Sequence, residues 1–321
     1  RPIRSQRAVH RHRRTWGSPD VDEELTDLLA TGERAAFHGR PAAGVAPLQR
    51  AVEVAHGSGH DAEATAAVWL LGVCLGAAGR YGAAMVVLEP LAEAETGDPE
   101  RRLFASLASA TLASVSRQLG RHAEARRLDL RALDLAGDAA EARFDAVLGL
   151  AADAVGLEEV TEADAALADA ATLVDGRADW WRQRVRLDWV RAEVALLRNR
   201  PEEAVSRSDA AVTLAEASGA PRHVAKGLLF EGVALVQVGE LEEAAVTLRR
   251  AATLAESLGA VPLVWPSRAV LGALVAPTNP AEGGASLQAA RAAVRQIAED
   301  LPGRYAEDWL ARPDIAALLA D

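Results

Sequence analysis

Histidines and paired carboxylates are the side chains whose types and spacing could support chemistry in this 321-residue chain. His56 and His60 lie in a glycine-rich stretch with Asp61 beside them, a combination that can ligate a metal ion. A polar loop between two helices has the same composition. We favour the loop and therefore predict no metal site.

Adjacent glutamates could act as a general acid and a general base. They fall at or near expected helix starts, where carboxylates also interact favourably with the helix dipole. The pairs are Glu23-Glu24, Glu202-Glu203 and Glu242-Glu243. The sequence contains no P-loop, no Gly-x-Ser-x-Gly, no His-Glu-x-x-His and no dinucleotide-binding fingerprint. We therefore expect a protein that is not an enzyme and that needs no cofactor.

The charge is distributed unevenly along the chain. Residues 1–14 hold six of the 35 basic residues and none of the 46 acidic ones, which leaves residues 15–321 with a formal charge of −17. Phosphate repulsion makes such an acidic body a poor surface for nucleic acid. We expect a solvated, disordered basic tail over residues 1–15. The alternative is that this tail, Arg1–Arg14, is a basic arm that binds nucleic acid or the acidic body itself.

The composition predicts a helical protein. Apolar residues make up 50% of the chain but aromatic residues only 4%, and alanine, the best helix former, dominates the apolar set. No apolar run reaches the roughly 20 residues that a membrane helix needs. The single cysteine, Cys74, excludes an internal disulfide and fits a reducing compartment, so we expect a cytoplasmic protein without a membrane partner.

Small residues recur along the chain at intervals of 38 to 41 residues. The first set is Gly32, Gly72, Ala113, Ala151, Ala192, Gly232 and Ala273. Twelve residues after each comes another small residue, and between them lie Gly39, Gly79, Gly120, Glu158, Asn199, Gly239 and Pro280. Glycine and asparagine end helices in a left-handed conformation, so each unit is predicted to be a helix, a turn and a second helix.

This pattern resembles the tetratricopeptide repeat (TPR) family. The resemblance is clearest in LLGVCLGAAGRYGAAMVVLEPL (residues 70–91) and FEGVALVQVGELEEAAVTLRRA (residues 230–251). It covers about residues 24–300, but the units are about 40 residues long, against 34 in the common TPR. Longer units resemble the sensor arrays of bacterial signalling regulators. Unit four lacks the turn glycine, and unit seven is interrupted by Pro277 to Gly284.

The resemblance implies an all-α solenoid of about seven antiparallel helix pairs in a right-handed superhelix. We expect a repeat array over residues 16–300 and a C-terminal capping segment over residues 301–321. Trp309, Ile315 and Leu318 of that segment could cover the last apolar surface.

By the same resemblance, the first helix of each unit lines a concave groove. The expected groove residues are Phe37, Trp69, Arg117, Gln118, Arg186, Trp189, Glu193, Lys226 and Gln237. An aromatic anchor beside a positive side chain is a common binding hot spot, so Trp189 with Arg186 and Lys226 is the strongest candidate. The alternative is that Trp69 and Trp189 pack between units. In the tandem Trp180-Trp181, one ring could belong to the core and the other to a partner contact.

The resulting hypothesis is a non-catalytic scaffold or sensor module that binds a protein, a peptide or a small molecule in its groove, in bacterial signalling or regulation. The alternatives are a self-assembling structural protein, in which the chain forms a homo-oligomer, and an accessory arm of a larger regulator or enzyme. The sequence leaves the ligand, the pathway and the oligomeric state open.

Overall fold

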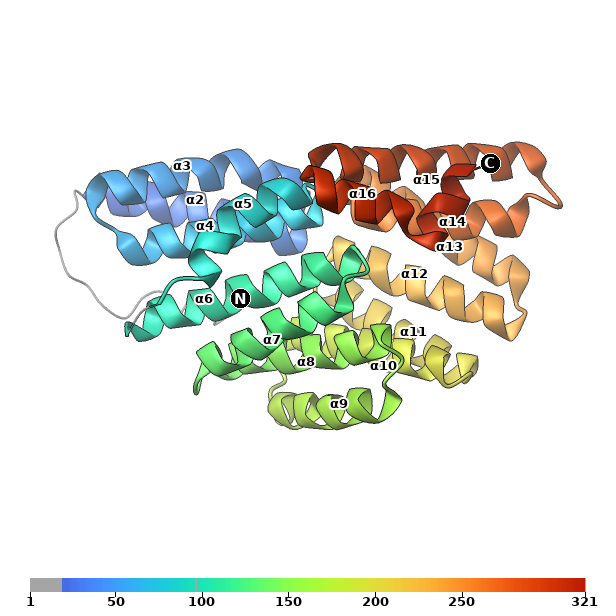
Figure 1. Cartoon of the computed structure of the whole chain (residues 1–321), viewed down its shortest axis with the longest axis horizontal. Coiled ribbons are helices and arrows are strands. Elements are labelled where there is room, and N and C mark those ends of the chain that lie inside the picture. Colours follow the sequence, from blue (N-terminus) through green and yellow to red (C-terminus); the bar gives the residue numbers. More distant parts are fainter. Residues whose placement is uncertain (1–18, 96, 321) are drawn as a thin grey trace.

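The computed structural model describes residues 19–95 and 97–320, which are helical and contain no strand (Figure 1). Seven antiparallel helix pairs follow one another, which confirms the predicted all-α repeat array. The pairs are α2 (Pro19–His38) with α3 (Val45–Ser58), α4 (Asp61–Ala77) with α5 (Tyr81–Ala92), α6 (Pro99–Gln118) with α7 (His122–Ala136), α8 (Ala140–Gly156) with α9 (Val160–Val174), α10 (Trp181–Leu197) with α11 (Pro201–Ala217), α12 (Pro221–Val238) with α13 (Leu241–Leu258), and α14 (Val261–Val275) with α15 (Pro280–Asp300). The short helices α16 (Gly303–Ala311) and α17 (Pro313–Ala320) complete the described chain. The predicted basic tail, residues 1–15, lies outside the described residues.

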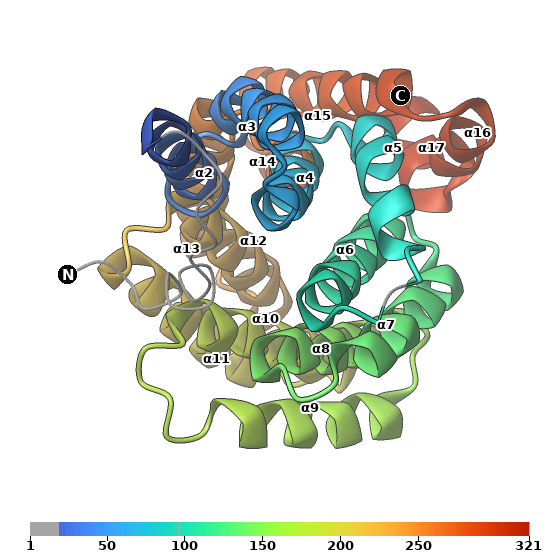
Figure 2. The ribbon, with the colours of Figure 1, turned by 90° about the vertical axis from the view of Figure 1, so that its left-hand side faces the viewer.

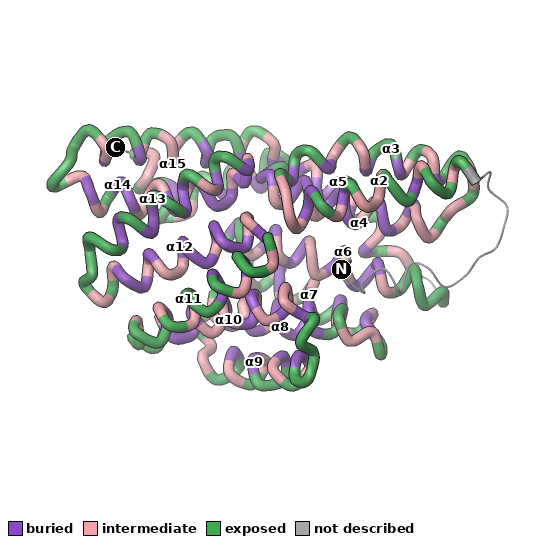
Figure 3. Tube along the Cα trace, turned by 180° about the vertical axis from the view of Figure 1, so that it is seen from behind, coloured by how far each residue is buried: buried purple, intermediate pink, exposed green. Residues whose placement is uncertain are grey.

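The helices form two concentric layers. Figure 2 shows the first helices of the units, including α4, α6, α10 and α12, around the interior, with α7, α9, α11 and α15 outside them. Buried residues alternate with exposed ones along the outer helices, as expected for helices with one apolar face (Figure 3). The inner helices therefore decide what faces the interior.

The turn inside a unit uses a left-handed residue in five of the seven units. The φ angles are 82° at Gly79, 79° at Gly120, 61° at Glu158, 55° at Asn199 and 96° at Gly239. In each case the amide of the next residue donates to the carbonyl five positions earlier, the hydrogen bond of a Schellman cap. Unit four therefore keeps the turn although Glu158 replaces the expected glycine.

The first and last units make this turn differently. Gly39 does not adopt a left-handed φ, contrary to the sequence prediction, because a short 3₁₀ helix (Pro41–Gly44) leads into α3. In unit seven, the side chain of Asn279 accepts a hydrogen bond from the Glu282 amide and so caps the start of α15. Helix α15 then runs through Gly283 and Gly284 without a break, so the expected interruption is a turn between two ordinary helices.

A leucine from the second helix packs onto the small residue of the first. A β-carbon added to Gly32 would lie 2.3 Å from Leu48, and one added to Gly72 would lie 2.4 Å from Leu88. The same contact recurs between Gly232 and Leu248, at 2.6 Å. The repeated small residues thus permit the close helix approach that the spacing predicted.

The array closes after one turn, so that the first units meet the last ones (Figures 1 and 2). Helix α2 lies beside α12, and a ring nitrogen of His38 lies 3.2 Å from the Gly219 carbonyl oxygen. Helix α5 meets the end of α15, where the Ala83 amide donates to the Asp300 carboxylate at 3.1 Å. The first and last units therefore pack together, and the array is closed rather than an open ribbon.

The segment after α15 strengthens this closure. Trp309 is only 1% exposed; its ring packs edge-on against Trp265 at 5.8 Å, on the last unit. Arg312 donates to the Gln118 carbonyl oxygen at 2.9 Å, and Arg121 pairs with Asp308 at 2.6 Å, on the third unit. The segment therefore covers the last unit and also joins it to the third.

Gly82 lies where α5 meets the end of α15, and a β-carbon there would lie 1.9 Å from the Asp300 carbonyl oxygen. We expect Gly82→Ala to lower the free energy of unfolding by about 1–3 kcal/mol, since α5 and α15 must separate. In the control Gly284→Ala the new methyl meets open space, and we expect a gain of about 0.5–1 kcal/mol. Urea denaturation measures both; a Gly82→Ala protein as stable as the wild type would contradict the closure.

Candidate ligand-binding site

Charged side chains repeat at one register position on three successive inner helices. Asp145 on α8, Arg186 on α10 and Lys226 on α12 each precede the small residue of their unit by six positions. One turn earlier, Arg182 and Arg222 extend the row on α10 and α12. Four cations therefore share two neighbouring inner helices.

Asp145 pairs with both arginines on α10. It accepts from Arg182 at 3.2 Å and also from Arg186, and its side chain is 9% exposed. Burial raises the pKa of Asp145, but the two guanidiniums outweigh burial and hold that pKa below its usual value. The acid on α8 thus satisfies the cations on the next inner helix.

The cations on α12 have no equivalent acid, because the matching position on α10 is Arg186. Neither Arg222 nor Lys226 makes an ion pair within the described part of the chain, and the Nε of Arg222 is buried without a hydrogen-bond partner. Burial, together with Arg186 and Arg182, lowers the pKa of Arg222 to about 10. Burial and the nearby arginines also lower the pKa of Lys226 to about 8, although Glu193 opposes this.

Aromatic rings surround these cations. His223 lies between two tryptophans: it stacks on Trp189 at 5.4 Å and meets the edge of Trp181 at 5.2 Å. The Lys226 ammonium lies 4.7 Å from the centre of the Trp189 ring, and Arg182 lies 5.2 Å from the centre of the Phe37 ring. The rings come from α2, α10 and α12, which only the closed turn brings together.

Two polar atoms within this aromatic cluster are buried without partners, namely Trp189 Nε1 and His223 Nδ1. Burial lowers the pKa of His223 well below its usual value, and four nearby cations, of which Arg222 has the largest effect, lower it further. The ring is therefore neutral at pH 7. Buried polar atoms are normally paired, and orphaned ones occur where a protein binds a ligand or water.

A second charged cluster lies deeper, between α6, α7 and α8. Arg117 binds Asp129 at 2.5 Å and Asp153 at 2.7 Å, and both carboxylates have 0% side-chain exposure. Burial raises the pKa of Asp129 although Arg117 opposes it. Gly149 leaves the room for this carboxyl group, since a β-carbon there would lie 2.1 Å from Asp129. One nitrogen of Arg117 thus joins three helices.

The nine predicted groove residues lie in three places. Phe37, Arg186, Trp189, Glu193 and Lys226 gather around α10 and α12, whereas Arg117 belongs to the cluster between α6, α7 and α8. Trp69, Gln118 and Gln237 lie elsewhere. Trp69 donates to the Thr111 hydroxyl at 3.2 Å between α4 and α6, and Gln118 accepts from the Tyr81 hydroxyl at 2.8 Å. Gln237 is exposed at the end of α12.

Trp189 is 6% exposed and belongs to the packing between units, the alternative that the sequence left open. The two tandem tryptophans have different environments. Trp180 is 8% exposed and packs against Phe144, whereas Trp181 is half-buried and contacts His38 and His223. Arg182, Arg222 and His223 were absent from the predicted set. Extending the inward register by one helical turn would have found both arginines.

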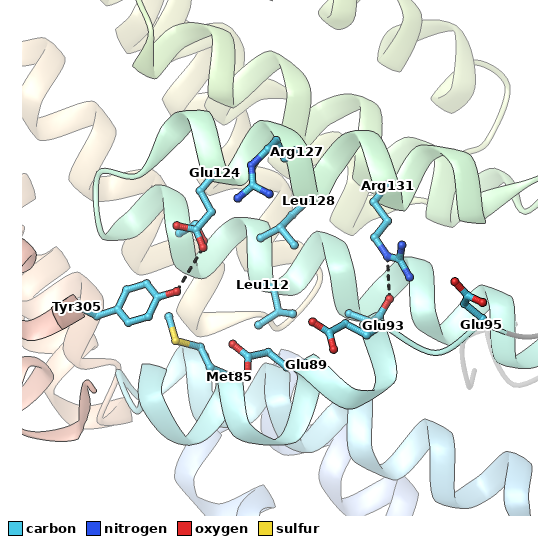
Figure 4. Close-up of a pocket in the computed structure, with 12 residues that line it drawn as sticks. Met85, Glu89, Glu93, Glu95, Leu112, Glu124, Arg127, Leu128, Arg131 and Tyr305 are labelled. Atoms are coloured by element: carbon cyan, nitrogen blue, oxygen red, sulfur yellow. Dashed lines mark hydrogen bonds between the residues drawn. The ribbon is translucent and has the colours of Figure 1, made fainter. Parts of the chain in front are cut away.

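A pocket of about 420 Å³ lies among α5, α6, α7 and α16 and has a different character (Figure 4). Glu89, Glu93 and Glu124 point toward it, Arg131 donates to the Ala92 carbonyl oxygen at its rim, and Tyr305 closes one end. Its acidic walls contrast with the cationic interior.

The predicted metal-ligand candidates have other partners. His60 contacts the Ser58 hydroxyl at 2.8 Å and the Asp22 carboxylate at 3.0 Å. Over residues 19–95 and 97–320, no three His, Cys, Asp or Glu side chains are grouped to hold a metal ion. None of the helices in these ranges combines the length and apolarity that crossing a membrane requires.

Known structures with this arrangement are TPR proteins. A Rap protein complexed with Competence and Sporulation Factor superposes with a TM-score of 0.61 at 12% identity, over 94% of this chain and 80% of that chain. NprR in complex with its cognate peptide NprX superposes at 0.56 and 13% identity, over 94% and 89%. The chain has a TPR-type fold. No family model and no curated protein matches the sequence.

A third TPR-type structure is longer than this chain. It is a Signal Transduction ATPase with Numerous Domains (STAND) protein with a tetratricopeptide repeat sensor, from Pyrococcus horikoshii. The TM-score is 0.53 at 14% identity, and the match covers 94% of this chain but 44% of that protein. At these identities the likeness concerns the TPR-type fold.

Arg117 offers a test of the deeper cluster. Arg117→Met leaves two fully buried carboxylates without their cation, and we expect a loss of about 3–5 kcal/mol in the free energy of unfolding. The control Arg198→Met breaks a pair with Asp164 that is partly exposed on both sides, and we expect a loss below about 1 kcal/mol. Equal losses in the two variants, measured by urea denaturation, would contradict the structural role of Arg117.

Lys226 gives a pH dependence with a definite sign. Its pKa of about 8 in the folded chain lies below the usual value of 10.5, so the unfolded chain binds more protons between these values. We expect the free energy of unfolding of the wild type to rise, relative to Lys226→Met, as the pH increases from 8 to 10. Parallel stability curves for the two proteins would show that burial and the nearby cations Arg222, Arg186 and Arg117 do not lower the pKa of Lys226.

Proposed function

We propose that this chain is a non-catalytic TPR-type module that binds a peptide or protein segment at the inner face of α10 and α12. The observation that carries the proposal is a cluster in which Arg222 and Lys226 make no ion pair within the described residues. In the same cluster Arg222 Nε, His223 Nδ1 and Trp189 Nε1 are buried without hydrogen-bond partners. A chain selected for stability alone gains nothing from such a group. A bound segment would supply the missing partners.

The fold supports a peptide or protein ligand. Two similar structures, the Rap protein and NprR, are complexes with Competence and Sporulation Factor and with the cognate peptide NprX. An extended segment suits an enclosed inner face, because successive inner helices offer side chains at regular spacing along its length. Half-buried aromatic rings add affinity, and the cations fix orientation.

We further propose that the module acts as a sensor or scaffold in bacterial signalling, in the cytoplasm. The likeness to a STAND protein with a TPR sensor supports a sensory role, alone or as an arm of a longer regulator. Binding at the inner face would contact helices on both sides of the junction that α2 forms with the later units, since Phe37 and His38 come from α2 whereas Trp181 comes from α10. Ligand occupancy would thus be coupled to the closure itself.

Selection of peptides by the folded protein tests this function. From a random dodecapeptide display library, we expect peptides whose affinity falls at least tenfold in Trp181→Ala, because the half-buried ring stacks in the site. Trp181 is preferred to Trp189, whose removal also destroys packing. The control is Leu130→Ala, a 52% exposed residue of the outer helix α7.

Circular dichroism checks that all variants keep the wild-type helicity. Peptides that bind Trp181→Ala as well as the wild type, or that depend on Leu130 instead, would contradict an inner-face site. Failure to recover any peptide would contradict a peptide-binding function.

A further inference from the structure

The inner face shows a regular pattern of charge compensation that stops at α12. On α8, Asp145 accepts from Arg182 and Arg186 of the next inner helix. On α7 and α8, Asp129 and Asp153 accept from Arg117. Each of these guanidiniums therefore meets a carboxylate, and each carboxylate comes from a neighbouring helix.

Arg222 is the exception. The register position on α10 that should supply its acid holds Arg186, so the neighbouring helix presents a cation to a cation. The groups that would, if ionised, counter the lowering of the Arg222 pKa are the Cys74 thiol and the Tyr81 hydroxyl. Both are neutral at pH 7, because burial raises the pKa of each above its usual value. No carboxylate of the described residues pairs with Arg222.

We propose that the segment bound at the inner face is acidic and places a carboxylate on the guanidinium of Arg222. This inference rests on the proposed function and narrows its ligand to an acidic peptide. Guanidinium binds carboxylate through two parallel hydrogen bonds, the same chemistry that Asp145 supplies one helix earlier. Arg182, Arg186 and Lys226 extend the positive field along the path of the segment, and Glu193 limits it on the side of Lys226.

The net charge of the whole chain restricts where an acidic peptide can bind. The formal net charge is −11, so an acidic peptide is repelled by most of the surface and attracted only where cations outnumber acids. Among the two cations of α12 and the two of α10, Asp145 and Glu193 leave an excess of positive charge. Residues 1–14 carry six further arginines, so the comparison of Arg222→Met with the wild type is what assigns the binding of an acidic peptide to this site.

The test uses hexaglutamate with blocked ends as the probe and the melting temperature at constant ionic strength as the readout. We expect hexaglutamate to raise the melting temperature of the wild type, and hexalysine and hexaglutamine to leave it unchanged. Arg222→Met should need at least tenfold more hexaglutamate for the same shift. The control Arg295→Met, an exposed arginine of α15, should respond as the wild type does.

Two further measurements guard against a folding defect in the variant. Without peptide, Arg222→Met should melt at or above the wild-type temperature, because it removes an unpaired cation from a crowded group. Arg222→Lys keeps the charge but loses the planar fork, and its response to hexaglutamate should lie between those of the wild type and Arg222→Met. Lower melting temperatures for both variants in the absence of peptide would make Arg222 a structural residue and overturn the proposal.

Citrate and inorganic phosphate test whether the site prefers an acidic peptide to a small anion. Citrate at matched carboxylate concentration should stabilise less than hexaglutamate, since the peptide spans several cations; an equal effect would make the ligand a small carboxylate and overturn the acidic peptide. An equal response to inorganic phosphate would show a general anion site and overturn the carboxylate.

Absence of any wild-type response to hexaglutamate also overturns the proposal. If selected peptides bind through Trp181 but lack acidic residues and ignore Arg222→Met, the acidic ligand fails while the binding function stands.

Discussion

The close approach of two helices at a side chain no larger than a methyl group determines the whole molecule. In units one, two and six a leucine of the second helix packs on such a residue, as at Gly72 and Leu88. The contact sets the separation of the two helices of a pair, and small residues recur at this position about every 40 residues. The stacked pairs complete one turn, which places α2 beside α12 and α5 beside α15.

The repeated part of the fold could be predicted from the sequence because its determinants are local. The small residues, the turn residues and the breakers between units all act within one helix pair, and the period exposed them. Glu158 shows the limit of this reasoning: it adopts the left-handed turn without being glycine, because the helices on both sides fix the turn. Gly39 shows the converse, since a 3₁₀ helix replaces the turn that its identity predicted.

The candidate site could be predicted only in part, because it depends on contacts between distant units. A register transferred from the TPR family found Arg186, Trp189 and Lys226, which lie on inner helices at the expected phase. It did not extend to Arg222, one turn further along the same face. It also assigned Gln118 to the groove, whereas that side chain accepts from Tyr81 of the preceding helix and the Gln118 carbonyl accepts from Arg312, far along the chain. No periodicity within a unit reports on such contacts.

Stability and binding occupy different charge clusters on the inner helices. Arg117 is satisfied by two buried carboxylates and holds α6, α7 and α8 together, whereas Arg222 has no ion-pair partner among the described residues and its Nε is buried without a hydrogen bond. If this second cluster receives an acidic segment, a crystal structure of the protein grown with hexaglutamate should show it. We expect peptide density with a carboxylate in contact with the Arg222 guanidinium. Peptide density only on the outer helices would rule out an acidic segment at this cluster.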